Sequence, residues 1–211
     1  MCLFLSSPSF AATATFNFSG VMDTVGSNLQ SSFSSGDNFF GTYTVDLDAT
    51  GSSLFGNYVR YSNLLNFSFS IGTYSVSIDN LGFTEVGDNN GPAMNFDSYY
   101  AAVQYMPNSF GPPIEGFYLG DFELGLFDDF GGAFSSTNLF PAFPPLSSFT
   151  AAVFRGSFWG PGGRLNGGTF GGGFSGTLTK IEPIAPVPLP ATSLILLGAM
   201  GILSLVAHRR R

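Results

Sequence analysis

The sequence predicts an all-β protein, and its composition and periodicity both support this. Phe supplies 25 of the 211 residues and Gly 28, while charged residues make up only 10%. Phe, Thr, Val and Tyr suit pleated surfaces, and Gly and Pro interrupt them. Between the two ends of the chain, apolar and polar residues alternate with a period of two. We therefore expect an antiparallel β-sandwich, with a jelly roll as one arrangement of its strands.

Ten segments have the alternation that strands require. In chain order they are residues 13–19, 42–47, 58–62, 65–71, 74–79, 81–86, 94–106, 116–127, 149–159 and 173–181. The segments 20–38, 130–148 and 160–173 break the pattern, and we expect them to be loops. The loop at 160–173 contains Gly-x-Gly fragments but no Walker lysine, so it does not predict a phosphate site.

The clearest predicted hairpin lies on either side of Gly72. Its apolar residues form one row, with Ser, Asn and Asp opposite them, as in a half-buried antiparallel sheet. The row expected to be buried is Leu65, Phe67, Phe69, Ile71, Tyr74, Val76 and Ile78.

Charge, cysteine and histidine exclude several classes of function. Ahead of the terminal arginines, the 14 acidic residues outnumber the basic ones, which are only Arg60, Arg155, Arg164 and Lys180. Such an acidic domain repels nucleic acid, so we expect no nucleic-acid partner. The single Cys is Cys2 and the single His is His208. A domain between them can form neither a disulfide nor a Ser-His-Asp or Cys-His unit, and we expect no enzyme and no cofactor.

Two acidic groups are the candidate chemical sites. Asp121 and Glu123 share a strand face, where paired carboxylates would suit a glycan-active enzyme; a polar strand edge followed by the turn at Asp128 and Asp129 is the simpler interpretation. Asp46 and Asp48 alternate ahead of Gly51 as in half of a calcium loop. Leu54 and Asn57 stand where its later ligands would be, so we expect a turn there, with calcium as the alternative.

The N-terminal residues 1–14 have the character of a partial signal peptide. They are apolar and small, and the run from Ala12 to Ala14 has the A-x-A form of a signal-peptidase site. No basic residue precedes the apolar run, so the beginning of the leader would lie upstream. The alternative is a buried first strand.

The C-terminal segment 182–211 predicts a membrane anchor. Pro183, Pro186, Pro188 and Pro190 keep its first part extended. The next residues, 189–207, carry no charge and as a helix would span about 28 Å, enough to cross a bilayer core. Arg209, Arg210 and Arg211 follow, and a basic end of this kind stays in the cytoplasm. The remainder of the chain is then expected outside.

The order of these parts resembles the PEP-CTERM sorting signal. Its motif here is Val187, Pro188, Leu189, Pro190 and Ala191, with Leu189 where the family usually has Glu. The resemblance covers about residues 186–211. It implies recognition by an exosortase, a membrane protease, followed by cleavage near the motif and release of a bacterial protein to the cell surface or extracellular matrix.

These observations divide the chain into a leader at 1–14, an extracellular β-domain at 15–181 and a sorting signal at 182–211. The function expected is that of a non-enzymatic surface or matrix protein. Two alternatives remain at this point: a carbohydrate-binding domain for exopolysaccharide, which the low surface charge would favour, and a glycan-active enzyme that uses carboxylates alone.

Overall fold

The computed structural model describes residues 12–89, 96–104 and 110–184, and this part of the chain is all-β, as predicted. The predicted transmembrane helix, the motif Val187–Ala191 and the arginines 209–211 lie outside the described residues, as do residues 1–11 of the predicted leader. Within the described ranges, no helix has the length and apolar character needed to cross a bilayer.

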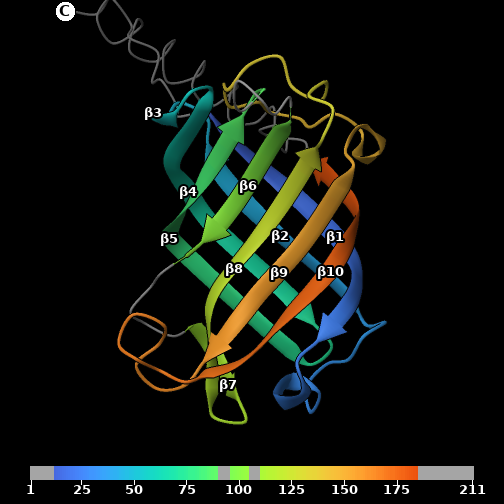
Figure 1. Ribbon diagram of the computed structural model, residues 1–211, viewed down its shortest axis with the longest axis vertical. Helices are drawn as coiled ribbons and strands as arrows, with labels where there is room; N and C mark the ends of the chain where they lie inside the picture. Colours follow the sequence, from blue (N-terminus) through green and yellow to red (C-terminus); the bar gives the residue numbers. More distant parts are fainter. Residues whose placement is uncertain (1–11, 90–95, 105–109, 185–211) are drawn as a thin grey trace, which may run out of the picture.

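Ten strands and two short 3₁₀ turns make up the described chain (Figure 1). The strands are β1 (Thr13–Val25), β2 (Asn38–Asp46), β3 (Ser52–Phe55), β4 (Tyr58–Ile71), β5 (Tyr74–Gly87), β6 (Asp97–Val103), β7 (Phe110–Ile114), β8 (Phe117–Asp128), β9 (Ala151–Trp159) and β10 (Phe170–Pro183). The turns are η1 (Ser27–Leu29) and η2 (Leu146–Ser148).

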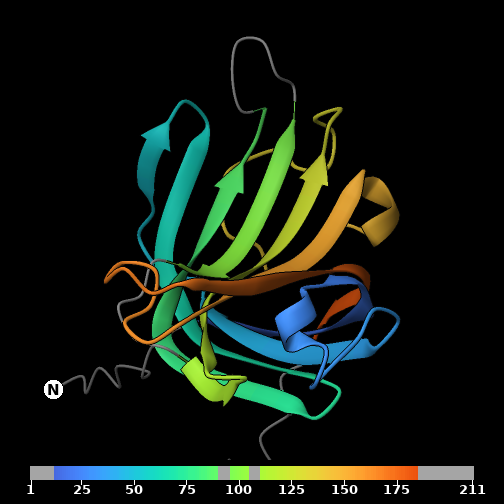
Figure 2. The same cartoon turned by 60° about the horizontal axis from the view of Figure 1, so that its bottom comes forward.

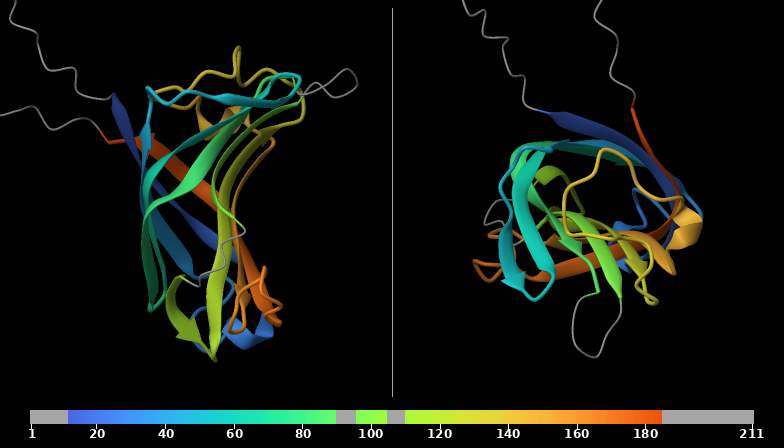
Figure 3. Two further views of the ribbon diagram at one scale, coloured as in Figure 1. Left: turned by 90° about the vertical axis from the view of Figure 1, so that its left-hand side faces the viewer. Right: turned by 90° about the horizontal axis from the view of Figure 1, so that it is seen from above.

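Eight of the strands form one antiparallel sheet that closes into a barrel. Its order is β2-β1-β10-β9-β8-β6-β5-β4, and β4 pairs back onto β2 from Phe39↔Ile71 to Val45↔Leu64. Figure 3, viewed from above, shows the resulting ring. The predicted sandwich is therefore corrected to a barrel-like sheet. Both folds bury one face of each strand, so alternation does not distinguish them; the β2–β4 pairing does.

Phenylalanine rings opposite inward-facing glycines fill the barrel. Phe16, Phe18, Phe39, Phe67, Phe122, Phe154 and Phe158 are all at most 2% exposed. A Cβ at Gly41 would overlap the Phe18 ring, and one at Gly156 would lie 2.7 Å from Cζ of Phe174. Each glycine thus leaves room on one strand for an aromatic ring from another strand. The abundance of both residue types follows from this packing.

The predicted hairpin row is confirmed except at its first residue. Phe67, Phe69, Ile71, Tyr74, Val76 and Ile78 are buried. Leu65 is only half-buried, and Leu64 points inward in its place, 3% exposed. The cause is a β-bulge: the pairing shifts on both sides of Leu64↔Gly82. The two shifts move the inward position from Leu65 to Leu64 locally, and Tyr61, upstream of both, is buried again.

Several strand boundaries differ from the predicted ones. β1 extends six residues into the predicted loop at 20–38, and the segments on either side of the bulge join into the single long strands β4 and β5. β3 and β7 were not predicted. Neither strand alternates clearly, since all of β3 is exposed and β7 contains two prolines. Each is added to one edge of a longer strand, β3 to β4 and β7 to β8.

The predicted loop 130–148 closes one end of the barrel. Figure 3 shows this yellow segment running across the ring of strands. The Phe143 ring packs 4.9 Å from Phe16 and 4.6 Å from Tyr99, measured between centroids. The Tyr61 hydroxyl donates to the carbonyl of Thr137 at 2.8 Å. Its aromatic residues therefore belong to the core, although the segment has no periodicity.

Two carboxylates that face each other across β6 and β8 hold this closing loop. Asp128 accepts hydrogen bonds from the backbone N–H groups of Phe130, Gly132 and Ala133, at 3.1, 2.7 and 3.1 Å. Its register partner Asp97 is fully buried and accepts from the N–H of Phe134 at 2.7 Å. The hydrogen bonds from the backbone N–H groups of Gly132, Phe130 and Ala133 hold the pKa of Asp128 below its usual range.

The opposite end is closed by the η1 region, in blue in Figure 2. Leu29 is fully buried there and Phe33 is 2% exposed. The Phe33 ring packs on Tyr74 and edge-on against Phe174, with centroids 6.1 and 5.8 Å apart. Both ends of the barrel are therefore covered, and the outer face of its strands is the surface available to ligands.

Gly156→Ala tests the pairing of rings with glycines. Overpacking should lower the free energy of unfolding by about 1–3 kcal/mol. In a Phe174→Leu background, which removes the overlapping ring end, the same substitution should cost at least about 1 kcal/mol less. Urea unfolding followed by fluorescence of Trp159 measures the cycle. Phe143→Leu, at the closing loop, is the control partner and should be additive; equal coupling in both cycles would contradict the packing account.

Asp128→Ala should destabilise the fold by about 2 kcal/mol or more, because three N–H groups lose their acceptor. The folded pKa of Asp128 is lowered, so its contribution is present at neutral pH and is lost as the pH falls through that pKa. The difference from wild type should therefore shrink in acid, measured by thermal unfolding across pH. The matched control is its exposed neighbour, Asp129→Ala. Similar losses in both variants would remove Asp128 from this role.

Candidate functional site

Three of the four basic residues outside the C-terminal tail lie on one outer face of the barrel. Arg60, Arg155 and Arg164 are each paired with a carboxylate there. We call these six residues the charged strip: Arg60, Glu85, Asp121, Glu123, Arg155 and Arg164. In a chain with so few charges, their concentration across β4, β5, β8 and β9 marks this face as the candidate site.

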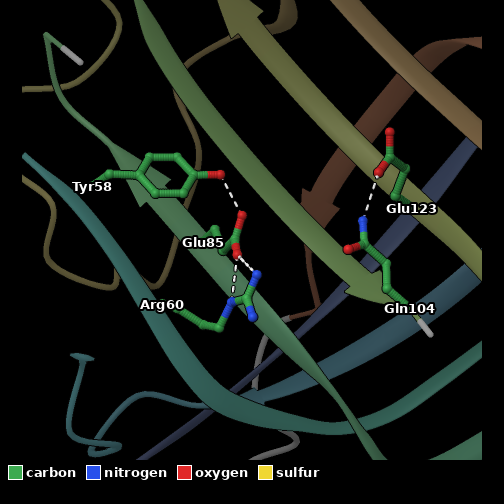
Figure 4. Close-up of polar contacts among 5 residues, drawn as sticks. All are labelled: Tyr58, Arg60, Glu85, Gln104 and Glu123. Carbon is green, nitrogen blue, oxygen red and sulfur yellow. Dashed lines mark hydrogen bonds and ion pairs between the residues drawn. The ribbon is translucent and has the colours of Figure 1, made fainter. Parts of the chain in front are cut away.

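Glu85 is the centre of the first pair (Figure 4). Its side chain is 9% exposed, and its carboxylate accepts from the Tyr58 hydroxyl and from the Arg60 guanidinium. The guanidinium carbon of Arg60 lies 4.1 Å from the centre of the Phe83 ring. Burial, and next the hydrogen bond to Glu85, raise the pKa of Tyr58, so this hydroxyl stays protonated.

Glu123 lies across β6 from the first pair, on the same face (Figure 4). It accepts from the Gln104 amide at 3.1 Å and pairs with Arg155 Nε at 3.2 Å. Register places Glu123 opposite Arg155 on β9. Burial raises the pKa of Glu123, while the charge of Arg155 and the hydrogen bond from Gln104 act in the opposite direction.

Asp121 forms the third pair, two residues along β8. Its Oδ1 accepts from the Ser157 hydroxyl at 2.6 Å, and its Oδ2 lies 3.8 Å from Arg164 Nη1. Arg164 comes from the loop after β9, and its guanidinium carbon lies 5.8 Å from the centre of the Trp159 ring. The predicted shared face of Asp121 and Glu123 is confirmed, and each carboxylate has its own guanidinium.

A hollow of about 330 Å³ lies over the second and third pairs. Gln104, Asp121, Glu123, Arg155, Ser157 and Arg164 all line it. Gly173 pairs with Ser157 on the adjacent strand and has no side chain to fill the space. The hollow is of the size of a small ligand site, and its wall contains two carboxylates and two guanidinium groups.

Two polar atoms at this site have no hydrogen-bond partner among the described residues. They are Oδ2 of Asp121, an acceptor, and Nε1 of Trp159, a donor. Buried polar atoms are satisfied in most folds, so each such atom requires an explanation. Both atoms are buried; Asp121 lines the hollow, whereas Trp159 lies next to it, beside Arg164.

The opposite wall, formed around β1 and β2, is uncharged over most of its area. Hydroxyl and amide side chains face outward in register, as in the row Asn17, Thr42, Ser68 and Ser77. Thr42 and Ser68 hydroxyls are 2.9 Å apart. A shallow hollow of about 680 Å³ lies over this wall, and Phe40 is 61% exposed at it. These hydroxyls already pair with each other, so this wall has fewer groups left for a ligand.

The weak calcium candidates form a hydrogen-bonded turn. Asp46 Oδ1 accepts from the N–H of Asp48 at 2.9 Å, and Asp48 Oδ2 accepts from the N–H of Ala12 at 2.8 Å. Both carboxylates are thus used to fix the chain after β2. Among the described residues, no group of three or more His, Cys, Asp and Glu is placed to hold a metal ion.

The predicted signal-cleavage residues lie where β1 begins. Ala14 is 8% exposed and pairs with Val45, while Ala12 accepts from the N–H of Leu47 at 2.7 Å through its carbonyl. Signal cleavage at Ala12 or Ala14 stays a prediction. A cut after Ala14 would remove the first two residues of the strand and the contact from Asp48.

Sequence reasoning found Asp121 and Glu123 but missed the groups that surround them. Arg155 and Ser157 come from β9 and Gln104 from the end of β6, and only the pairing of strands brings them to the same face. Alternation along β9 places Arg155 and Ser157 outward. Their partners follow from the register, which the sequence does not contain.

Comparison with known proteins gives no relative for this barrel. No protein-family model matches the chain, and no curated protein and no solved structure gives a significant match. The tail sequence and the outer wall of the barrel are therefore the features from which function is inferred.

Arg155→Met should raise the pKa of Glu123 further, because it removes the main group that favours the ionised form. A folded pKa above the unfolded value means that stability falls as pH rises through the folded pKa, and the variant should show a steeper fall. Carboxyl ¹³C NMR titration measures the shift. Lys180→Met, which removes the cation beside Glu182 on the opposite wall, is the control. An unchanged Glu123 titration in Arg155→Met would contradict this electrostatic account.

Proposed function

We propose that this chain is an exported, non-enzymatic surface or matrix protein of a bacterium, held at the membrane by its C-terminal segment and released by an exosortase-type protease. The single observation that carries the proposal is the order of parts in that segment. Val187–Ala191 is followed by an uncharged stretch to residue 207 and then by Arg209, Arg210 and Arg211. An apolar span with a basic end both anchors a protein and fixes its direction.

The end of the barrel is compatible with a removable tail. β10 ends at Pro183, and the N–H of Ile184 donates to the carbonyl of Thr15 at 2.7 Å, so the described sheet closes before the motif begins. The start of β1 and the end of β10 lie side by side, at the end of the barrel that the closing loop 130–148 covers (Figure 3).

The charged strip favours a binding role over catalysis. A carboxylate pair that cleaves glycosides divides into an acid and a base or nucleophile, both of which must reach the bond to be cut. Here Asp121 and Glu123 are each held by a guanidinium, and Ser157 and Gln104 occupy further lone pairs. These contacts fix the carboxylates in place as part of the wall.

Expression in a bacterial host with and without a functional exosortase tests the proposal. Without the protease, the protein should stay in the membrane fraction with its barrel accessible to added protease from outside. With it, a form shorter by about 20–25 residues should appear outside the membrane, since the motif lies that far from the end of a chain whose final helix spans a bilayer. Intact-mass measurement locates the new end.

Replacing Pro188 and Pro190 by Ala is the matched control, because it alters the motif and leaves the apolar span and arginines intact. This variant should remain anchored in both hosts. An external protein that still carries Arg209–Arg211, or an unchanged location after removal of residues 186–211, would overturn the proposal.

A further inference from the structure

The hollow over the second and third pairs of the charged strip contains groups of the kinds that recognise sugar hydroxyls. Two carboxylates, two guanidinium groups, the Gln104 amide and the Ser157 hydroxyl converge on it. Planar groups of this kind offer two hydrogen-bonding atoms each, which matches neighbouring hydroxyls on one ring. The Trp159 indole lies next to the hollow, beside Arg164, and adds an aromatic side chain to its border.

The charge of the site selects among sugars. Within the hollow, Asp121 and Glu123 balance Arg155 and Arg164, so a neutral ligand meets no net charge. An anionic polymer would have to displace a carboxylate from its guanidinium, and it would approach a domain with an excess of acidic residues. A cationic ligand would have to displace a guanidinium instead. The balance therefore favours an uncharged, hydroxyl-rich ligand.

The polar groups that line the hollow indicate how such a ligand would be held. Asp121 Oδ2 makes no hydrogen bond among the described residues and has only the looser ion pair with Arg164 Nη1, at 3.8 Å. A ligand hydroxyl in the hollow can accept from the guanidinium groups of Arg155 and Arg164 and donate to the carboxylates of Asp121 and Glu123. The gap left at Gly173 provides room beside Ser157. Ligand hydroxyls would then share the donors and acceptors of these two ion pairs.

From these contacts we infer that the hollow lined by Asp121, Glu123, Arg155, Ser157 and Arg164 is a binding site for an uncharged sugar unit, of the kind that a neutral polysaccharide carries. The inference rests on the geometry of the outer wall and is independent of the sorting tail. Failure of sorting leaves it intact, and its failure leaves the sorting proposal intact.

Titration of the full-length chain, purified in mild detergent, with soluble neutral polysaccharides tests the inference. The probes are dextran, mannan and xyloglucan, with alginate as the anionic comparison. Trp159 is the only tryptophan of the chain and borders the site, so its fluorescence reports binding directly. At least one neutral polymer should shift the emission and retard the protein in an affinity gel, and alginate should do neither.

Asp121→Asn and Glu123→Gln should each weaken binding about tenfold or more, because each removes a charged acceptor. Asp79→Asn and Glu182→Gln make the same chemical changes outside the hollow, at exposed positions, and should leave the dissociation constant within about twofold, since neither touches the site. Circular dichroism confirms that each variant is folded.

If the carboxylate variants do not fold, Arg164→Gln tests whether the hollow is the binding site. Arg164 lies in a loop, and its side chain is 46% exposed, so its loss should not affect folding and should still weaken binding. Three results would overturn the inference: no neutral polymer binds, alginate alone binds, or Asp79→Asn and Glu182→Gln lose binding as strongly as the site variants do.

Discussion

Filling the inside of a closed eight-stranded barrel is the constraint on which the rest of this structure depends. Such a barrel has an interior just wide enough for side chains, so every inward position must match its neighbours in volume. The chain meets this requirement with large rings and absent side chains. Phe39 occupies space over both Gly20 and Gly176, and Phe18 lies over Gly41. Because the rings cross the interior, the fold depends on contacts between strands that are distant in the sequence.

Because the interior of the barrel is filled by side chains, a ligand would bind on the outer face of its strands. Both ends are covered, one by the loop around Phe143 and the other by Leu29 and Phe33. Outward positions are therefore where polar chemistry can be placed, and most of them carry uncharged hydroxyls. Each arginine of the strip is instead paired with a carboxylate and lies beside an aromatic ring, which is Phe83, Phe127 or Trp159. Isolated surface ion pairs add little to stability, so folding alone does not account for this concentration of charge.

Sequence reasoning predicted the class of fold and most strand positions, because alternation records which face of a strand is buried. It could not predict closure. The β2–β4 pairing depends on register between distant segments, and a sandwich and a barrel have the same alternation. Leu65 shows a second limit: the irregular pairing around Leu64 and Gly82 changes which residue faces inward, and the composition of the segment does not reveal it. The closing loop shows a third, since Phe134, Phe140 and Phe143 join the core without any period.

The same limits apply to the site. The sequence predicts that Asp121 and Glu123 share a face, because they are two residues apart on one strand. Their chemical role depends on residues that neighbouring strands place beside them. Two carboxylates alone would repel each other and would be consistent with catalysis or with metal binding. Once Arg155 and Arg164 are placed beside them, the site is electrically balanced, and Ser157 and Gln104 hold the carboxylates in one orientation. A balanced, preorganised set of donors and acceptors can bind an uncharged ligand without first rearranging, which lowers the free-energy cost of binding.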